Sequence, residues 1–229
     1  MSLERELKLE PLDAFLLERL AALDQLGPFR VVGRRTEQQR NSFFDSRTGA
    51  LGAARLALRR RRVPGQALAT WTLKAEGELL RGVASRPEVE VHLGADVPPA
   101  MALGTLAQAA RQRGAAALAE EVADALVGSA PVLATPFLES ETTRRVLDLE
   151  DPRSGTQLEL ALDHVQLVGH ADYSEQEIEV ELRRGNESAL EQARSAIAAL
   201  GPTRDGEGSK LSRALDHVRN PACGCRASG

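Results

Sequence analysis

Aromatic residues and cysteines are scarce in this chain of 229 residues. Phe, Tyr and Trp together make up 3% of the sequence, so few side chains are able to sandwich a purine or thiamine ring. The two cysteines, Cys223 and Cys225, have no further Cys or His at the spacing of a zinc site. We interpret residues 218–229 as a disordered C-terminal tail whose thiols are incidental.

Long apolar runs and an excess of one charge are also missing. No apolar run is long enough to span a bilayer, and the first residues lack the apolar core of a signal peptide. The net charge of −4 combines 33 acidic with 29 basic residues, so overall charge does not indicate a nucleic-acid binder. We therefore expect a cytoplasmic protein with neither a membrane nor a nucleic acid as its partner.

Apolar spacing and turn residues predict many strands and a few helices. Strands are expected near 3–10, over 29–45 as an extended pair, and at about 54–62, 67–75, 85–93, 137–149, 156–168 and 173–183. Helices are expected over 11–26, over 99–127 with a break near Gly114, and over 187–200 with Asn186 as a plausible N-cap. A short last element is expected over 210–218.

Each predicted strand carries one charged face and one apolar face, because side chains alternate along a strand. In the first strand Glu4, Glu6 and Lys8 share one face, opposite Leu7 and Leu9. The other charged faces hold Arg55, Arg59 and Arg61; Thr70, Thr72 and Lys74; Arg86, Glu88, Glu90 and His92; Glu159 and Asp163; and Glu175, Glu177, Glu179 and Glu181.

An antiparallel sheet with its charged side in water is the simplest explanation of this alternation. However, the predicted helices are sufficient to cover the apolar faces, and sheets of about eight strands tend to curl or close. If the sheet closes, its charged faces point inward and line a wet tunnel. Buried carboxylates cost several kcal/mol each without partners, so such a lining requires basic residues, metal ions or an anionic ligand.

Nine motifs in this chain resemble, in order, those of the CYTH domain of the triphosphate tunnel metalloenzymes. They are Glu4-Arg5-Glu6-Leu7-Lys8, Asn41-Ser42-Phe43-Phe44-Asp45-Ser46, Leu58-Arg59-Arg60-Arg61, Trp71-Thr72-Leu73-Lys74, Arg86-Pro87-Glu88-Val89-Glu90, Thr143-Arg144, the strands Glu159–Asp163 and Glu177–Leu182, and the closing Ser209-Lys210 with Arg213. The resemblance implies an α+β fold in one domain over residues 1–217. Its sheet would form a closed eight-stranded antiparallel tunnel with a charged interior and helices packed outside.

The resemblance and the chemistry of phosphoryl transfer together assign roles to the charged residues. The implied phosphate-binding residues are Lys8, Arg59, Arg61, Lys74, Arg86, Arg144, Lys210 and Arg213. The implied ligands of Mg²⁺ or Mn²⁺ are Glu4, Glu6, Glu177, Glu179, Glu181, Glu159 and Asp163, with Glu88 and Glu90 as further candidates. Glu4, Glu6 and Lys8 are the implied catalytic residues. For Glu88, Glu90 and Glu159, salt bridges to neighbouring arginines are an alternative role.

Among the members of this family, the chain looks most like bacterial inorganic triphosphatases. The implied activity is metal-dependent hydrolysis of inorganic tripolyphosphate to pyrophosphate and phosphate. A thiamine triphosphatase, a class IV adenylate cyclase and a non-catalytic module that binds polyphosphate or a nucleotide are the alternatives. The implied partner is a small-molecule triphosphate, and a homodimer is left open.

Overall fold

The computed structural model describes residues 3–128 and 131–220, except for the side chains of residues 3, 4, 78, 79, 85 and 86. The predictions for the side chains of Glu4 and Arg86, and for the cysteine tail, lie outside this described part. The chain forms two compact units. The described residues of unit 1 are 3–5, 37–78, 84–128 and 131–141, and those of unit 2 are 6–36, 79–83 and 142–220.

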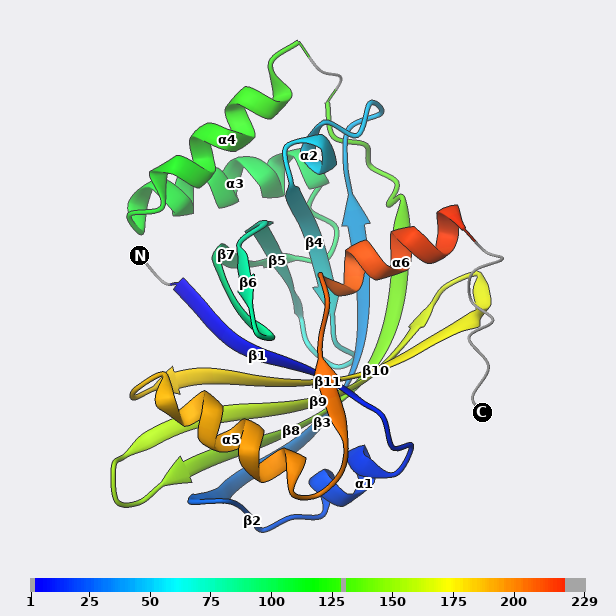
Figure 1. Cartoon of the computed structure of the whole chain (residues 1–229). Helices are drawn as coiled ribbons and strands as arrows, with labels where there is room; N and C mark the ends of the chain where they lie inside the picture. Colours follow the sequence, from blue (N-terminus) through cyan, green and yellow to red (C-terminus); the bar gives the residue numbers. More distant parts are fainter. Residues whose placement is uncertain (1–2, 129–130, 221–229) are drawn as a thin grey trace. The chain divides into compact units, whose positions relative to one another are not determined.

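The described residues form eleven strands and six helices, which Figure 1 labels along the chain. In order, they are β1 (Leu3–Pro11), α1 (Leu16–Ala21), β2 (Gln25–Leu26), β3 (Phe29–Phe44), α2 (Ala50–Ala53), β4 (Leu56–Arg62), β5 (Leu68–Ala75), β6 (Glu78–Leu80), β7 (Val83–Gly94), α3 (Pro99–Gln112), α4 (Ala116–Leu126), β8 (Leu138–Asp151), β9 (Thr156–Leu167), β10 (His170–Arg184), α5 (Ser188–Ala198), β11 (Thr203–Asp205) and α6 (Lys210–Arg219). Eight of these strands have seven or more residues, which is the number of strands that the resemblance implies.

In unit 2 the strands follow the order β11–β1–β10–β9–β8–β3. The antiparallel register of β1 and β10 pairs Lys8 with Glu179, and that of β10 and β9 pairs Glu177 with Asp163. Helices α1 and α5 cover the apolar face of these strands (Figure 1). The core between them contains Leu7, Leu9, Leu16, Leu20, Leu160, Leu162, Ile178, Val180, Leu190 and Ile197. Because the apolar residues occupy one face, the charged residues of each strand are left on the other.

In unit 1 the strands follow the order β3–β4–β5–β7, and α3 and α4 pack on their apolar face. Trp71 is fully buried in this core, as its position on the apolar face predicts. The guanidinium group of Arg60 lies 5.3 Å from the ring centre of Phe44 and 5.6 Å from that of Trp71. Arg60 therefore stacks on the apolar face, as the alternation along β4 indicates.

The predicted helix over 11–26 is shorter in the structure, where α1 spans Leu16–Ala21. Asp13 accepts a hydrogen bond from the backbone amide of Phe15, which holds the preceding residues in a turn. Leu12 and Phe15, which the helical spacing places in the core, are 56% and 71% exposed. The predicted extended pair over 29–45 is one strand of 16 residues.

The short elements α2, β2, β6 and β11 were not predicted. The predicted break near Gly114 is found between α3 and α4, and the φ of Gly114, 78°, is easily adopted only by glycine. Asn186 is not the N-cap of α5, which is Glu187, but its side chain accepts a hydrogen bond from the amide of Ser188 in the first turn. A capping box between Ser209 and Ser212 begins α6, which reaches Arg219, two residues beyond the predicted end of the domain.

The α+β class and the antiparallel sheet are confirmed. Closure of the sheet into a tunnel and a single domain over residues 1–217 stay predictions. Among the described helices, none combines the length and the apolar character needed to cross a membrane.

Candidate active site

Buried carboxylates line the charged face of β10. Glu177 and Glu179 alternate with Ile178 and Val180, and all four residues are buried. The two apolar residues belong to the core under α5, so the two carboxylates point to the opposite face of the sheet. Burial of two neighbouring carboxylates is unfavourable unless cations compensate them.

Asp163 of β9 completes a group of three carboxylates. It lies opposite Glu177 in the antiparallel register and is fully buried. One oxygen from each of Asp163, Glu177 and Glu179 lies within 4.8 Å of the others. Oxygen donors at this spacing form a site that suits a hard divalent cation such as Mg²⁺ or Mn²⁺.

Lys8 of β1 lies against these carboxylates and is itself buried. Its ammonium nitrogen donates to Oε1 of Glu179 at 2.8 Å and lies 3.1 Å from Oε1 of Glu6. The register of β1 with β10 fixes this contact, because it places Lys8 directly opposite Glu179.

Arg144 of β8 reaches the same group from the other side of β9. Its guanidinium donates to both oxygens of Asp163, with Nε at 2.8 Å from Oδ1, and to Oε2 of Glu179 at 2.5 Å. The motif alignment selects Arg144 rather than Arg145, and Arg144 is the one that lies beside the buried carboxylates. Arg145 instead donates to Glu18 of α1, on the helix-covered side.

Helix α6 contributes two further cations from its first turns. Lys210 donates to Oε1 of Glu179 at 2.6 Å and also to Glu177. Arg213 donates hydrogen bonds from two nitrogens to Glu175, at 3.0 and 3.1 Å, and one to Glu177 at 2.7 Å. Four cations from β1, β8 and α6 therefore compensate the carboxylates of β9 and β10.

The surrounding charges shift the pKa values of Glu177 and Glu179 in opposite directions. Burial raises the pKa of Glu177 above its ordinary value, although Lys210 and Lys8 act in the opposite direction. Burial also acts on Glu179, but there Lys210, Lys8 and Arg144 outweigh it and hold the pKa well below its ordinary value. Burial alone would lower the pKa of both lysines, but the surrounding carboxylates outweigh it and raise their pKa values. Both lysines are therefore cationic at neutral pH.

Glu159 and Glu181 belong to a neighbouring group of ion pairs. Oε2 of Glu159 lies 2.7 Å from Arg35 and 3.0 Å from Arg183. Glu181 lies 2.6 Å from Arg183. Glu159 therefore forms salt bridges of the kind expected for its alternative role. Sequence reasoning missed Arg35, because no charged face was assigned to its strand.

The charged face of unit 1 carries other predicted phosphate-binding residues. Arg59 is half-buried, lies 3.6 Å from Glu90 and donates to Thr72 at 3.2 Å. Lys74 pairs with Glu88. Glu90 thus lies beside an arginine, as its alternative role requires, whereas the partner of Glu88 is a lysine.

Arg61 continues the same face of β4 and donates to Asn41 at 3.4 Å. Its partner lies opposite in the register of β3 and β4, which also places Phe43 opposite Arg59. Phe43 is nine-tenths buried, so one aromatic ring accompanies the basic residues of this face.

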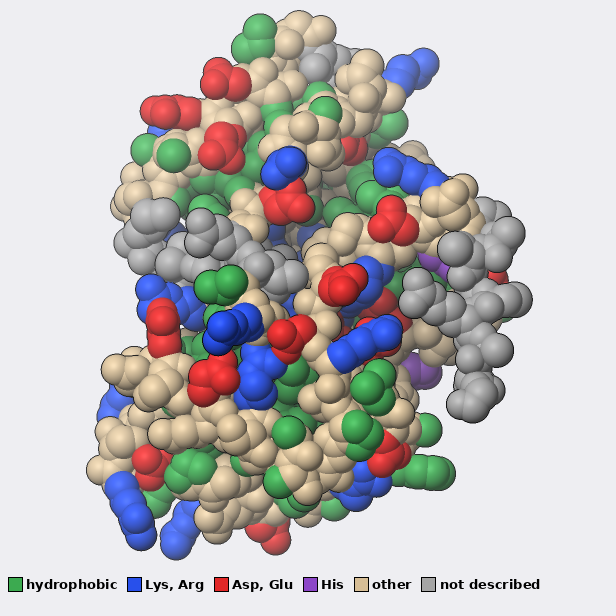
Figure 2. All heavy atoms as spheres, in the orientation of Figure 1, with side chains coloured by type: hydrophobic (Ala, Val, Ile, Leu, Met, Phe, Trp, Pro, Cys, Tyr) green, Lys and Arg blue, Asp and Glu red, His purple; other side chains and the backbone are tan. Residues whose placement is uncertain are grey.

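The surface around β11 and the start of α6 carries both charges. In the space-filling view, acidic and basic side chains lie next to one another there, without a continuous basic patch (Figure 2). This mixture agrees with the balanced composition of the chain.

Comparison with known proteins places this arrangement in a family. The CYTH domain family matches residues 2–215. No curated protein matches the chain significantly in sequence.

Several solved structures share the fold. HpAC1 from Hippeastrum is similar at 23% identity and a TM-score of 0.61, over 93% of this chain and 95% of its own. PH1819 from Pyrococcus horikoshii OT3 has 17% identity and a TM-score of 0.53, over 92% and 98%. A protein from Bacillus halodurans described as an adenylate cyclase has 18% identity and a TM-score of 0.53, over 93% and 98%. These likenesses concern the fold. The match of the family over nearly the whole sequence shows that the chain belongs to the CYTH domain family.

Proposed function

We propose that this protein is a metal-dependent triphosphatase that hydrolyses inorganic tripolyphosphate to pyrophosphate and phosphate. One observation carries the proposal: three cations from three different elements, Lys8, Arg144 and Lys210, converge on one buried carboxylate, Glu179. Phosphoryl transfer depends mainly on positioning and charge neutralisation, and converging cations supply both for a polyanion.

Phosphate oxygens would replace carboxylate oxygens as partners of these cations. Charge-assisted hydrogen bonds of this kind contribute roughly 1.5–3 kcal/mol each. Lys8 and Lys210 would bind as point charges, whereas Arg144 and Arg213 offer planar forks that can hold two oxygens.

The carboxylates released by this exchange fit a divalent cation. Left without partners, Asp163, Glu177 and Glu179 would each cost several kcal/mol in a buried site. Their oxygens lie within 4.8 Å of one another, a donor set that suits Mg²⁺ or Mn²⁺. Bound there, the ion would neutralise charge on the phosphates and on the leaving group. Glu4, Glu6, Glu181 and Glu159 remain proposed ligands, and the catalytic role of Glu4, Glu6 and Lys8 is part of the same proposal.

The charged face of unit 1 would hold the remaining phosphate oxygens through Arg59, Arg61, Lys74 and Arg86. This requires the strands to close into a tunnel with charged faces inward. Support comes from the consistent separation of charged and apolar faces in both units and from membership in the CYTH family.

Scarcity of aromatic residues favours an inorganic substrate over a nucleotide or thiamine triphosphate. Trp71, Phe29 and Phe44 are buried in the cores, where they cannot contact a ligand. Phe43 opposite Arg59 is the observation that keeps a nucleotide substrate as the second candidate. HpAC1, a structural relative, has a dominant triphosphatase activity. The proposed partner is thus a small-molecule triphosphate in the cytoplasm.

A substrate panel with product analysis tests this proposal. The full chain is incubated with tripolyphosphate, ATP or thiamine triphosphate, each with Mg²⁺, Mn²⁺ or a chelator. We expect the fastest phosphate release from tripolyphosphate and none with the chelator. Faster turnover of ATP or thiamine triphosphate, or formation of cyclic AMP, would assign one of the alternatives.

A matched pair of variants distinguishes an enzyme from a binding module. Glu179→Gln removes the shared carboxylate, whereas Glu10→Gln removes a partly exposed carboxylate that pairs with Arg204. An enzyme loses turnover in the first variant and keeps it in the second. Tight tripolyphosphate binding without turnover in the wild-type protein would indicate a non-catalytic module.

A further inference from the structure

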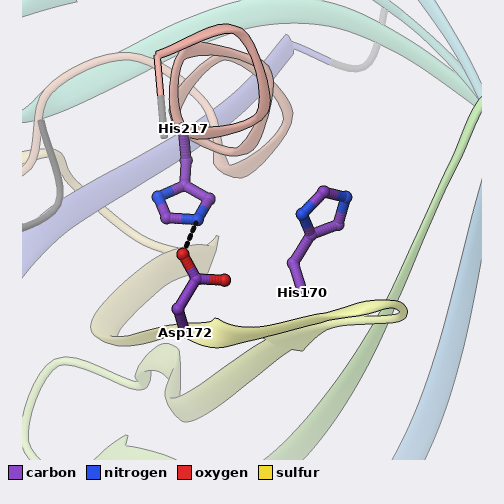
Figure 3. A group of neighbouring side chains, drawn as sticks. All are labelled: His170, Asp172 and His217. Carbon is purple, nitrogen blue, oxygen red and sulfur yellow. Dashed lines mark ion pairs between the residues drawn. The ribbon is translucent and has the colours of Figure 1, made fainter. Parts of the chain in front are cut away.

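Two histidines and an aspartate meet beside the charged network of unit 2. His170 and Asp172 lie at the start of β10, and His217 lies in the last turn of α6 (Figure 3). One ligand atom from each of the three lies within 4.8 Å of the others. Nε2 of His217 is 3.0 Å from Oδ2 of Asp172.

The donor set differs from that of the three buried carboxylates. Two imidazole nitrogens and one carboxylate oxygen suit Zn²⁺ and similar first-row divalent ions, whereas Mg²⁺ prefers oxygen alone. Asp172 has a side chain that is 63% exposed, so a fourth position can be taken by water. The spacing of up to 4.8 Å is wider than that of ligands around one Zn²⁺, and small rotations of the Asp172 and His170 side chains would close it.

His217 itself points to a ligand. Its side chain is about nine-tenths buried, and its Nε2 atom makes no hydrogen bond among the described residues. The contact with Asp172 meets the distance of an ion pair but lacks the direction of a hydrogen bond. A pair of His217 and Asp172 alone would leave Nε2 of His217 without a hydrogen bond and would not explain why His170 lies beside them. A cation between the three side chains accounts for all of them.

The position of His217 connects this group to the candidate active site. Lys210, Arg213 and His217 follow one another at intervals of three and four residues and so lie on one side of α6. The ring of Tyr173 packs edge-on against that of His217 at 5.0 Å, and its hydroxyl donates to Glu175, the partner of Arg213. The first turns of α6 are therefore held by carboxylates of β10, and its last turn by this histidine group.

We propose that His170, Asp172 and His217 bind a transition-metal divalent cation such as Zn²⁺, which fastens the end of α6 to the start of β10. The site is separate from the proposed triphosphate chemistry, since it shares no residue with the three buried carboxylates. Its role is to stabilise the helix that carries Lys210 and Arg213.

Cobalt binding followed by visible absorption tests the site directly. Co²⁺ bound to few ligands including imidazole absorbs more strongly than Co²⁺ bound by six oxygens. The full chain is titrated with Co²⁺ in saturating Mg²⁺, so that the oxygen sites are occupied. Cys223 and Cys225 are replaced by Ser in a parallel series, because thiolates also bind Co²⁺.

Matched histidine variants decide the outcome. We expect at least a tenfold loss of Co²⁺ affinity in His170→Ala, His217→Ala and Asp172→Asn. His164→Ala should bind like the wild-type protein, since His164 lies on β9 and contacts Ser174 instead. Zn²⁺ should raise the thermal unfolding temperature of the wild-type protein and of His164→Ala but not of His217→Ala.

Three results would overturn the proposal. One is unchanged Co²⁺ affinity in His170→Ala, which alters a hairpin residue and leaves α6 intact even if His217→Ala fails to fold. Another is an equal loss of affinity in His164→Ala. Loss of the visible signal in the Cys→Ser series alone would likewise assign the metal to the tail and contradict the site.

Discussion

Arg144 and Arg145 are consecutive residues of β8 whose side chains pair on opposite faces of the sheet. Arg144 binds Asp163 and Glu179, whereas Arg145 donates to Glu18 of α1 at 2.6 Å. Since neighbouring side chains on a strand alternate, only one of two adjacent arginines can reach the buried carboxylates. This pair therefore gives a comparison in which residue type and strand are the same and only the face differs.

Replacing each arginine by alanine should separate catalysis from packing. Arg144→Ala removes a cation of the proposed phosphate site, and we expect triphosphate turnover to fall at least a hundredfold. Arg145→Ala removes a half-exposed pair with Glu18, which contributes about 0–1 kcal/mol, and should leave turnover within a few-fold of wild type. Steady-state phosphate release measures both variants. Equal losses would contradict the assignment of faces.

Glu179 should be a residue on which stability also depends. Glu179→Gln leaves Lys8, Arg144 and Lys210 without their shared counter-charge. Breaking a buried pair typically costs about 3–5 kcal/mol, so the free energy of unfolding should fall by that order in a chelator. Urea unfolding at neutral pH measures the change, with Glu10→Gln as the exposed control. An unchanged midpoint would mean that these cations find other partners.

The three consecutive arginines of β4, residues 59–61, offer a second test of how side chains alternate between the two faces of the sheet. Arg59 and Arg61 occupy the charged face, whereas Arg60 stacks on Phe44 and Trp71. We expect Arg59→Ala and Arg61→Ala to raise the KM for tripolyphosphate with little loss of stability. Arg60→Ala should lower the stability and leave the KM for tripolyphosphate almost unchanged, because it removes packing from the apolar face. Kinetics and thermal unfolding of the three variants check this, and a raised KM in Arg60→Ala alone would refute it.

Glu90 should make stability depend on pH. Burial raises its pKa, but Arg59 and the hydroxyl of Thr72 outweigh burial and leave the pKa below the ordinary value of 4.5. The folded state thus binds the proton less tightly than the unfolded state, and the carboxylate contributes stability above pH 4.5 that is lost as the pH falls. The difference in unfolding free energy between wild type and Glu90→Gln should shrink between pH 5 and pH 3. A difference that is constant or grows over this range would show that the carboxylate is not stabilising.

Much of the fold could be predicted because the alternation of charged and apolar residues along a strand depends only on the local sequence. The charged and apolar residues of β1, β9 and β10 occupy the faces that their spacing indicates, and Arg144, which the motif alignment selects, lies on the charged face. The end of the first helix could not be predicted in the same way. Leu12 and Phe15 fit a helical pattern, but the side chain of Asp13 bonds the amide of Phe15 and delays the start of α1.

Ion-pair partners on distant strands were harder to predict than the sheet face that each side chain occupies. Glu159 pairs with Arg35 of β3, a contact that depends on which strands become neighbours and not on the sequence around either residue. The requirement for glycine at position 33 also depends on which strands become neighbours, since a Cβ there would lie 2.6 Å from an oxygen of Asp148. His217 was interpreted only as part of a short last element, because its nearness to His170 arises from the placement of α6 on unit 2.

The account depends most on an exchange of partners, in which a divalent ion takes the carboxylates and the phosphates take the cations. Isothermal titration with a non-hydrolysable imido analogue of tripolyphosphate measures this directly, once with Mg²⁺ and once with a chelator. The account predicts tight binding with Mg²⁺ and binding at least a hundredfold weaker without it, since Glu179 then keeps Lys8, Arg144 and Lys210. Equally tight binding in the chelator would contradict it.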